Sequence, residues 1–184
     1  MPLERYLVEF SAPTLASLKA ASLFSLPCES EEELSGQLAE WSRVLAPKGV
    51  SLTVLRRDGG RAVIYVYRRT HLIRDLRRPG VGEFLARQGY SGAGLEQALS
   101  LLRARMARGG DFPHEIGLFL GYPLEDVAGF MEHKGKNCLC TGWWKVYGNE
   151  EEARKSFRRF QKCREVYLRL WRAGRPVEQL TVPV

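Results

Sequence analysis

The chain has 184 residues, of which 45% are hydrophobic and 27% are charged, a composition typical of a globular protein with one domain. No apolar run approaches the roughly eighteen residues that a membrane-spanning helix needs. The first ten residues lack the apolar core of a secretion signal. Four cysteines are too few for a disulfide framework. We therefore expect a cytoplasmic protein that does not span a membrane and whose thiols are reduced.

The formal net charge of +7 is unevenly distributed. The stretch from Arg56 to Arg108 holds twelve arginines and four acidic residues, so it carries +8 and the remainder −1. A basic face of this kind can attract phosphate or nucleic acid. The stretch has no aromatic–basic repeat and no recognisable RNA-binding signature. A solvated surface is therefore favoured over nucleic-acid binding.

Hydrophobic periodicity and turn residues predict the elements in chain order. Helices are predicted at residues 3–10, 31–45, 70–76, 81–88, 95–107 and 150–173, with two short ones between residues 111 and 131; strands are predicted at 50–56, 61–67 and 141–147. Pro13 should end the first helix, because proline disfavours helical backbone at the residue before it. Ser30 and Glu33 form a capping box that starts the second.

The clearest local signal is a β-hairpin whose turn is Asp58–Gly59–Gly60. Residues of this type between two β-rich runs favour a tight turn. Both faces of the second strand are apolar, so the sheet should be covered by helices on both sides. The prediction is an α+β fold with a small three-stranded antiparallel sheet packed by several helices, in a single domain over residues 1–184.

Residues 114–131 contain a spacing that resembles a helix-turn-helix. Gly117, Gly121 and Val127 fall at the small–Gly–Val positions of that motif. DNA binding is therefore one hypothesis. The presumed reading helix carries Glu125 and Asp126 in its first turn, where carboxylates would repel phosphate. A plain helical hairpin is the favoured interpretation.

Cys138 and Cys140 form a C-x-C pair. In an extended segment their side chains would share a face and could bind Zn²⁺ together with His114 or His133. However, structural zinc sites use C-x₂₋₄-C spacing, and the chain has no second cysteine pair. Thiol chemistry is another hypothesis. Packing as small buried residues beside the neighbouring tryptophans is favoured over both.

Three blocks, at residues 11–24, 114–130 and 134–148, together resemble a bacterial family that is common in anaerobic Gram-positive organisms and known only as a domain of unknown function. The resemblance covers nearly the whole chain and implies motif positions, but no mechanism. These positions are Pro13, Thr14, Leu15, Lys19, His114, Glu115, Gly121, Tyr122, Gly135, Lys136, Asn137, Cys140, Trp144, Lys145 and Tyr147. The family usually has cysteine where this chain has Ser11, which weakens any scheme that pairs this position with Cys140, and Cys140 is more typical than Cys138.

These motifs predict one pocket built from residues 11–19, 114–122 and 137–144. Its predicted ligand-binding residues are Ser11, Thr14, Lys19, Glu115, Tyr122, Lys136, Asn137 and Trp144. Two of them are lysines, so the expected ligand is small and anionic. If the protein is an enzyme, Cys140 is the expected nucleophile and His114 its base. A metal or cofactor protein using His114, Cys138 and Cys140, and a DNA-binding regulator, are the alternatives. The sequence identifies no particular cofactor.

Overall fold

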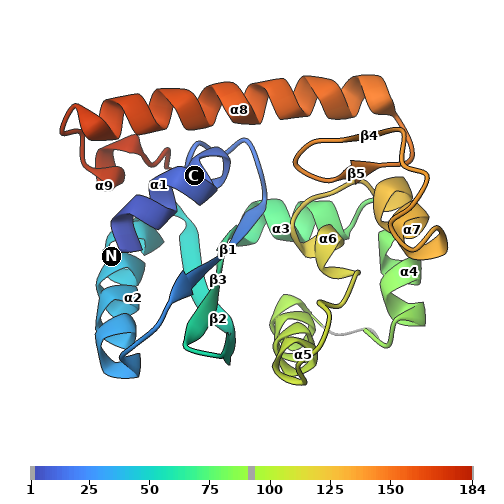
Figure 1. Cartoon of the computed structure of the whole chain (residues 1–184), viewed down its shortest axis with the longest axis horizontal. Coiled ribbons are helices and arrows are strands. Elements are labelled where there is room, and N and C mark those ends of the chain that lie inside the picture. Colours follow the sequence, from blue (N-terminus) through green and yellow to red (C-terminus); the bar gives the residue numbers. More distant parts are fainter. Residues whose placement is uncertain (1–2, 91–93, 184) are drawn as a thin grey trace.

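The computed structural model describes residues 3–90 and 94–183 and has the predicted α+β architecture (Figure 1). The helices in the described ranges are α1 (Leu3–Leu15), α2 (Glu31–Leu45), α3 (Arg69–Leu76), α4 (Val81–Arg87), α5 (Leu95–Ala107), α6 (Ile116–Phe119), α7 (Leu124–Glu132), α8 (Glu150–Arg172) and α9 (Val177–Leu180), with a 3₁₀ turn at Ala46–Lys48. The strands are β1 (Ala21–Pro27), β2 (Val50–Asp58), β3 (Arg61–Arg68), β4 (Cys140–Thr141) and β5 (Lys145–Val146). None of the described helices is long and apolar enough to cross a bilayer.

The main sheet is antiparallel, with strand order β1–β3–β2. Its β2–β3 hairpin turns at Gly59 and Gly60, both with positive φ, as the sequence predicted. A bulge in β2 lies between Val54 and Arg56. Because β3 is central, its alternating side chains must be buried on both faces.

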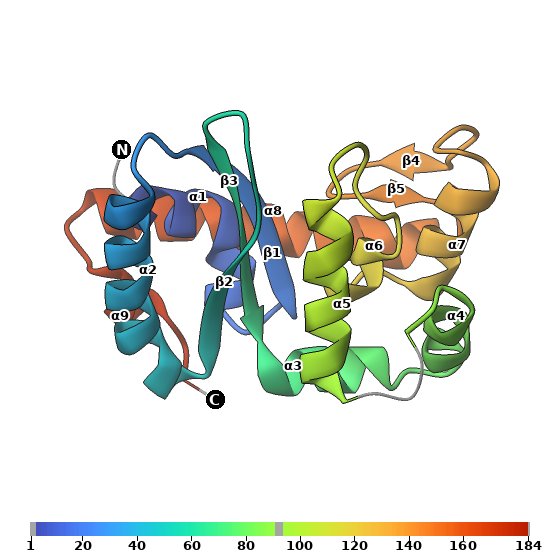
Figure 2. The ribbon, with the colours of Figure 1, turned by 90° about the horizontal axis from the view of Figure 1, so that it is seen from below.

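The sheet lies between two hydrophobic clusters, with helices on each face (Figure 2). Ile64 and Val66 of β3 belong to the cluster beneath α1 and α2, whereas Val63 and Tyr65 belong to the one that includes α4–α7. Helix α8 runs along the molecule and passes over both α1 and the β4–β5 hairpin (Figure 1). The N-terminal and C-terminal parts of the chain therefore pack together.

The first helix extends past Pro13, contrary to the prediction that it ends there. Helix α1 continues to Leu15, with Pro13 in its last turn. Because proline has no N–H, the helix lacks the hydrogen bond that residue 13 would otherwise donate to the carbonyl of Glu9. The Pro13 carbonyl accepts the backbone N–H groups of Leu18, at 2.9 Å, and Lys19, at 3.2 Å. Proline thus belongs to the turn that closes the helix.

The third strand of the sheet is not the predicted segment. Residues 141–147 contribute only the two-residue strands β4 and β5, which form a separate hairpin, because Gly142 to Trp144 make the turn between them. The third strand is β1, which pairs with β3 from Ala21 to Pro27. Pro27 is tolerated there because β1 is an edge strand.

Candidate functional site

A large open cavity lies where α1, β1, α8 and the β4–β5 hairpin meet. Its volume is about 1030 Å³. We call it the Lys19 cavity. Its lining comprises Glu9, Phe10, Lys19, Ser22, Leu23, Leu120, Tyr122, Gly142, Trp143, Phe157, Arg158, Gln161, Lys162, Arg164 and Glu165. All three segments that the sequence predicted to form a pocket contribute to it, through Lys19, Tyr122 and the turn of the hairpin.

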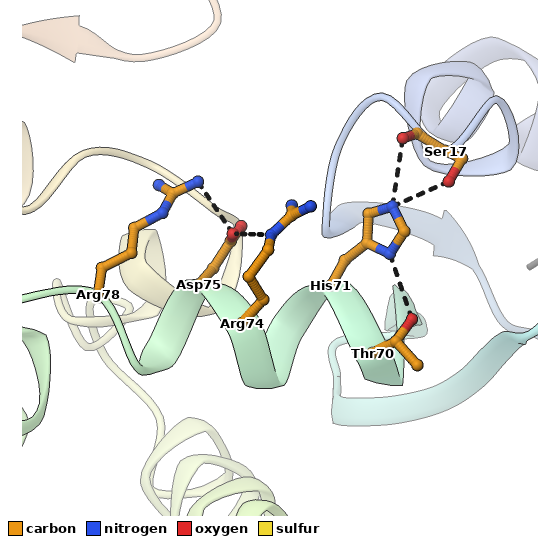
Figure 3. Close-up of polar contacts among 6 residues, drawn as sticks. All are labelled: Ser17, Thr70, His71, Arg74, Asp75 and Arg78. Carbon is orange, nitrogen blue, oxygen red and sulfur yellow. Dashed lines mark hydrogen bonds and ion pairs between the residues drawn. The ribbon is translucent and has the colours of Figure 1, made fainter.

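Lys19 is held in place by the turn that follows α1. Ser17 has a φ of 62°, which reverses the chain direction after the helix. Its hydroxyl is hydrogen-bonded to Nε2 of His71 at 2.8 Å, and Figure 3 shows this contact between the turn and α3. The next residues bond back to Pro13, and β1 then begins at Ala21. Lys19 is therefore fixed between a helix and a strand.

The Lys19 side chain is buried, with only 7% of its surface exposed. Its Nζ donates to the Ala21 carbonyl at 2.5 Å and lies 5.2 Å from the centre of the Tyr122 ring. Among the described residues no carboxylate lies within ion-pair distance of this nitrogen. Desolvation by burial lowers the pKa of Lys19 from 10.5 to about 7. It is a buried amine without a counter-charge.

The aromatic wall of the cavity is anchored by Asp126 of α7. Its buried carboxylate accepts the indole N–H of Trp144 at 2.6 Å and the backbone N–H groups of Tyr147 and Gly148, each at 2.8 Å. Trp144 in turn stacks on Tyr122, with ring centres 4.8 Å apart. The hairpin, α7 and the ring below Lys19 are thus tied together. The sequence analysis noted Asp126 only as an obstacle to DNA binding.

A second cavity of about 300 Å³ lies behind this wall, and it contains His114. We call it the aromatic cavity. Tyr122 lies between this cavity and the Lys19 cavity, since it lines both, whereas Trp144 lines the aromatic cavity but not the Lys19 cavity. His114 lies against the Phe130 ring, with centres 5.0 Å apart. His114 and Lys19 therefore belong to different cavities.

Glu115 takes part in a buried ion pair. Its Oε1 accepts from Nη1 of Arg105 at 2.5 Å and from the hydroxyl of Tyr90 at 3.1 Å. These contacts join α5 to the segment before α6. They direct Glu115 into the core, and it lines none of the cavities described here.

The two motif cysteines are free thiols at the start of the hairpin. The charged neighbours that act on Cys140 are Glu150 and Arg154 of α8. Partial desolvation and the nearby Glu150 carboxylate raise the pKa of Cys140, so the reactive thiolate is disfavoured. Cys140 lines none of the cavities described here, including the one that contains His114. The predicted nucleophile and base are not brought into a shared cavity.

No metal centre forms from these residues. Within residues 3–90 and 94–183, no group of three or more His, Cys, Asp or Glu side chains is placed to hold a metal ion. The Cys138 sulfur instead lies 3.5 Å from the Thr141 hydroxyl. The arrangement therefore offers no support to the metal-binding alternative.

Of the remaining predicted ligand residues, two are buried and two are exposed at the surface. Thr14 is buried and its hydroxyl is hydrogen-bonded to that of Ser22 at 2.8 Å, and Ser22 lines the Lys19 cavity. Ser11 is fully buried, and its hydroxyl has no partner among the described residues. Lys136 and Asn137 are exposed and lie outside the three cavities described. Only Lys19 and Tyr122 of the predicted set line the large cavity directly.

Lys19 also lines a smaller cavity of about 200 Å³ beside α3. There the buried Asp75 carboxylate lies between the guanidinium groups of Arg74 and Arg78, at 3.2 and 2.9 Å (Figure 3). We call it the α3 cavity. Asp75 is thus already paired with one arginine of α3 and one just after its end, which leaves Lys19 without this carboxylate as a partner.

The helix-turn-helix that was considered as an alternative for residues 114–131 is not seen in the described part of the chain. Helix α6 has only four residues, too few for the first helix of that motif. A side chain at Gly117 would collide with Val127, at 2.8 Å, and with Tyr122, so the small–Gly–Val spacing reflects tight packing. The first turn of α7 is also covered by the protein's own hairpin through Asp126. The arrangement of α6 and α7 agrees with the favoured interpretation of a plain helical hairpin.

The residues of α8 that line the large cavity are absent from the predicted site. Arg158 and Lys162 face it, although the sequence showed them only as part of a basic helix face. Helical periodicity indicates which residues share a face, but not what that face covers. Arg158 and Lys162 line the cavity because α8 packs against α1.

Comparison with known proteins identifies one family. Nothing among curated proteins matches the chain, and no solved structure matches it. A family profile matches residues 7–181, which is all but the first six and the last three residues. This finding agrees with the resemblance seen in the sequence, at the level of a family without an assigned activity. The chain belongs to the family described as Protein of unknown function (DUF3793).

Proposed function

We propose that this protein binds a small organic anion in the Lys19 cavity, with Lys19 as the anchor. The observation that carries the proposal is the buried ammonium group, which has one backbone acceptor and no carboxylate partner in the described chain. Burying a cation without a counter-charge is unfavourable. An anionic ligand would supply the missing charge.

The cavity lining has the composition expected for such a ligand. Its charged residues are four basic and two acidic, namely Lys19, Arg158, Lys162, Arg164, Glu9 and Glu165. Arg164 lies 3.5 Å from Glu9, so those two charges largely offset each other. The rings of Phe10, Tyr122, Trp143 and Phe157 provide apolar surface. A ligand with an aromatic ring and a carboxylate fits this combination.

Proton uptake on binding provides the test. At pH 8 most of the Lys19 amine is neutral, since its pKa is about 7. A bound anion favours the charged form, so binding 3-phenyllactate at pH 8 should take up close to one proton, and at pH 6 almost none. Isothermal titration calorimetry in buffers of different ionisation enthalpy measures this number.

Two variants distinguish a specific role of Lys19 from a general effect of positive charge on ligand binding. Lys19→Met should abolish the proton uptake and weaken 3-phenyllactate binding at least tenfold. Lys155→Met removes an exposed charge of α8 that does not line the cavity and should leave both unchanged. Equal binding by the wild-type protein and Lys19→Met would contradict the proposal.

A further inference from the structure

We propose that the Lys19 amine forms an imine with a carbonyl-bearing carboxylate in the Lys19 cavity. The inference rests on the proposed function and deepens it, because it names the substrate class as 2-oxo acids with an apolar side chain.

The amine has the accessibility that such a reaction requires. Nζ makes one hydrogen bond, to the carbonyl of Ala21, and its side chain lines the Lys19 cavity, which is large enough for a small organic acid. A lysine becomes a nucleophile for carbonyl groups when burial in apolar surroundings favours its neutral form. The Tyr122 ring, 5.2 Å away, provides such a surface, and the lowered pKa of Lys19 is consistent with it.

No charged group around Lys19 in the described chain pairs with its amine. The charged or titratable groups that line the two cavities beside it are Glu9, Tyr122, Arg158, Lys162, Arg164 and Glu165 on one side and Arg74, Asp75, Arg78, Glu125 and Glu152 on the other. Asp75 is paired with Arg74 of its own helix and with Arg78 just after the end of that helix. In the described chain none of the carboxylates lies within 4.0 Å of Nζ.

The part of the cavity wall that α8 provides suits the carboxylate of the substrate. Arg158 and Lys162 of α8 line the same cavity and take part in no ion pair among the described residues. For a 2-oxo acid, these cations rather than Lys19 would hold the carboxylate, which leaves the Lys19 amine neutral and able to attack the neighbouring carbonyl carbon. The aromatic rings of Trp143 and Phe157, which also line this cavity, would contact an apolar side chain of the substrate.

The reaction balances without a further reactant. The nitrogen lone pair attacks the carbonyl carbon and forms the C–N bond, while the carbonyl oxygen takes up a proton from water and the nitrogen gives one up. The resulting carbinolamine then loses its hydroxyl group and the remaining amine proton as water, which leaves the C=N bond. No oxidant or reductant is required, and hydrolysis reverses the step.

Reductive trapping tests this step. The full-length protein is incubated with phenylpyruvate and sodium cyanoborohydride, which delivers hydride to the imine carbon and makes the adduct permanent. Peptide mapping then measures the modified fraction of each lysine. We expect modification of Lys19 at least tenfold above any other lysine at pH 7.5, because more of its amine is neutral. The yield at Lys19 should rise from pH 6 to 8 and then level, whereas the yields at exposed lysines should continue to rise.

The control ligand 3-phenyllactate has a hydroxyl in place of the carbonyl and cannot form an imine. If it binds with the expected proton uptake but phenylpyruvate modifies Lys19 no faster than exposed lysines, the imine is excluded and anion binding stands. If 3-phenyllactate does not bind and Lys19 is not selectively trapped, both proposals fail. Lys19→Arg, which keeps the charge, should retain 3-phenyllactate binding and lose all trapping at this position. The wild-type measurement does not depend on the folding of any variant.

Discussion

Arg68 of β3 donates a hydrogen bond from Nη2 to the carbonyl of Leu15, the last residue of α1, at 2.6 Å. The same side chain, fully buried, also donates to the carbonyls of Thr14, at 2.6 Å, Val182, at 2.6 Å, and Lys48, at 3.1 Å. One guanidinium group therefore donates hydrogen bonds to carbonyls at the end of α1. It also links the C-terminal segment to the sheet. The carbonyl end of a helix also favours a positive charge.

Arg68→Met should lower the free energy of unfolding by about 3–5 kcal/mol, because several buried carbonyls would lose their donors. Urea denaturation followed by circular dichroism measures the loss. Arg43→Met, which replaces an exposed arginine of α2, is the matched control and should change stability by less than about 0.5 kcal/mol. Similar losses in both variants would contradict a structural role for Arg68.

Lys19 makes the stability of the protein depend on pH. Its pKa is about 7 in the folded chain against an ordinary value of 10.5. Between these values the unfolded chain binds more protons, so stability rises with pH in this window. The free-energy cost of burying Lys19 therefore has its full value below pH 7 and falls to zero above pH 10.5. Lys19→Met removes it, and should be more stable than the wild-type protein by about 3–5 kcal/mol at pH 6.

This advantage should shrink by roughly 1.4 kcal/mol per pH unit above pH 7. Urea titrations of both proteins at pH 6, 7.5 and 9 measure the trend. Lys155→Met, at an exposed position on α8, should show no such convergence. A difference between the wild-type protein and Lys19→Met that stays constant from pH 6 to 9 would contradict the buried, unpaired state of the amine.

Asp126→Asn should destabilise the hairpin, although the two side chains have the same shape. Three N–H groups point at the carboxylate, from Trp144, Tyr147 and Gly148. An asparagine must turn its own NH₂ group toward one of these donors, so we expect a loss of about 1–3 kcal/mol. Urea denaturation measures it.

Proton NMR of the indole N–H of Trp144 provides a second readout for Asp126. The resonance should move upfield in Asp126→Asn, since the charged acceptor 2.6 Å away is lost. Trp41, which lies on α2 away from the hairpin, is the internal control. An unchanged Trp144 resonance would show that the indole does not bond to Asp126 in solution.

Cys140 should react slowly with iodoacetamide at pH 7.5, because its pKa is raised by desolvation and by Glu150. Glu150→Gln removes the negative charge and should increase the alkylation rate at Cys140 severalfold. Tandem mass spectrometry of the peptide separates Cys140 from Cys138. Cys140→Ser should leave 3-phenyllactate binding unchanged. A rapid reaction in the wild-type protein, or loss of binding in Cys140→Ser, would instead favour a functional thiol.

The sequence correctly predicted those parts of the fold that are determined by residues close together in the chain. The Ser30 cap is present, with its hydroxyl accepting from the N–H of Glu33 at 3.2 Å, and the Gly59–Gly60 turn joins the predicted strands. The errors lie where distant contacts decide. Residues 21–27 become a strand because β3 offers them a partner, and this partner is about forty residues away.

The candidate site shows the same difference between what local sequence predicts and what long-range packing decides. Lys19 and Tyr122 could be selected from their motifs, and both reach the large cavity. Glu115 has an equally clear motif, but its side chain is buried in an ion pair with the half-buried Arg105 and does not reach the cavity. Arg158 and Lys162 could not be assigned, because their place depends on how α8 docks on α1. Sequence patterns identify chemical groups, whereas long-range packing decides which groups meet.

The lining of the Lys19 cavity extends along the chain from Glu9 of α1 to Glu165 of α8. During synthesis on the ribosome, the first strand, its neighbours and Lys19 emerge long before α8 does. The cavity therefore has no second wall until nearly the whole described chain has been made, since contacts distant in sequence form late. Any ligand that binds there selects finished molecules over nascent ones, so its binding reports that α8 has docked.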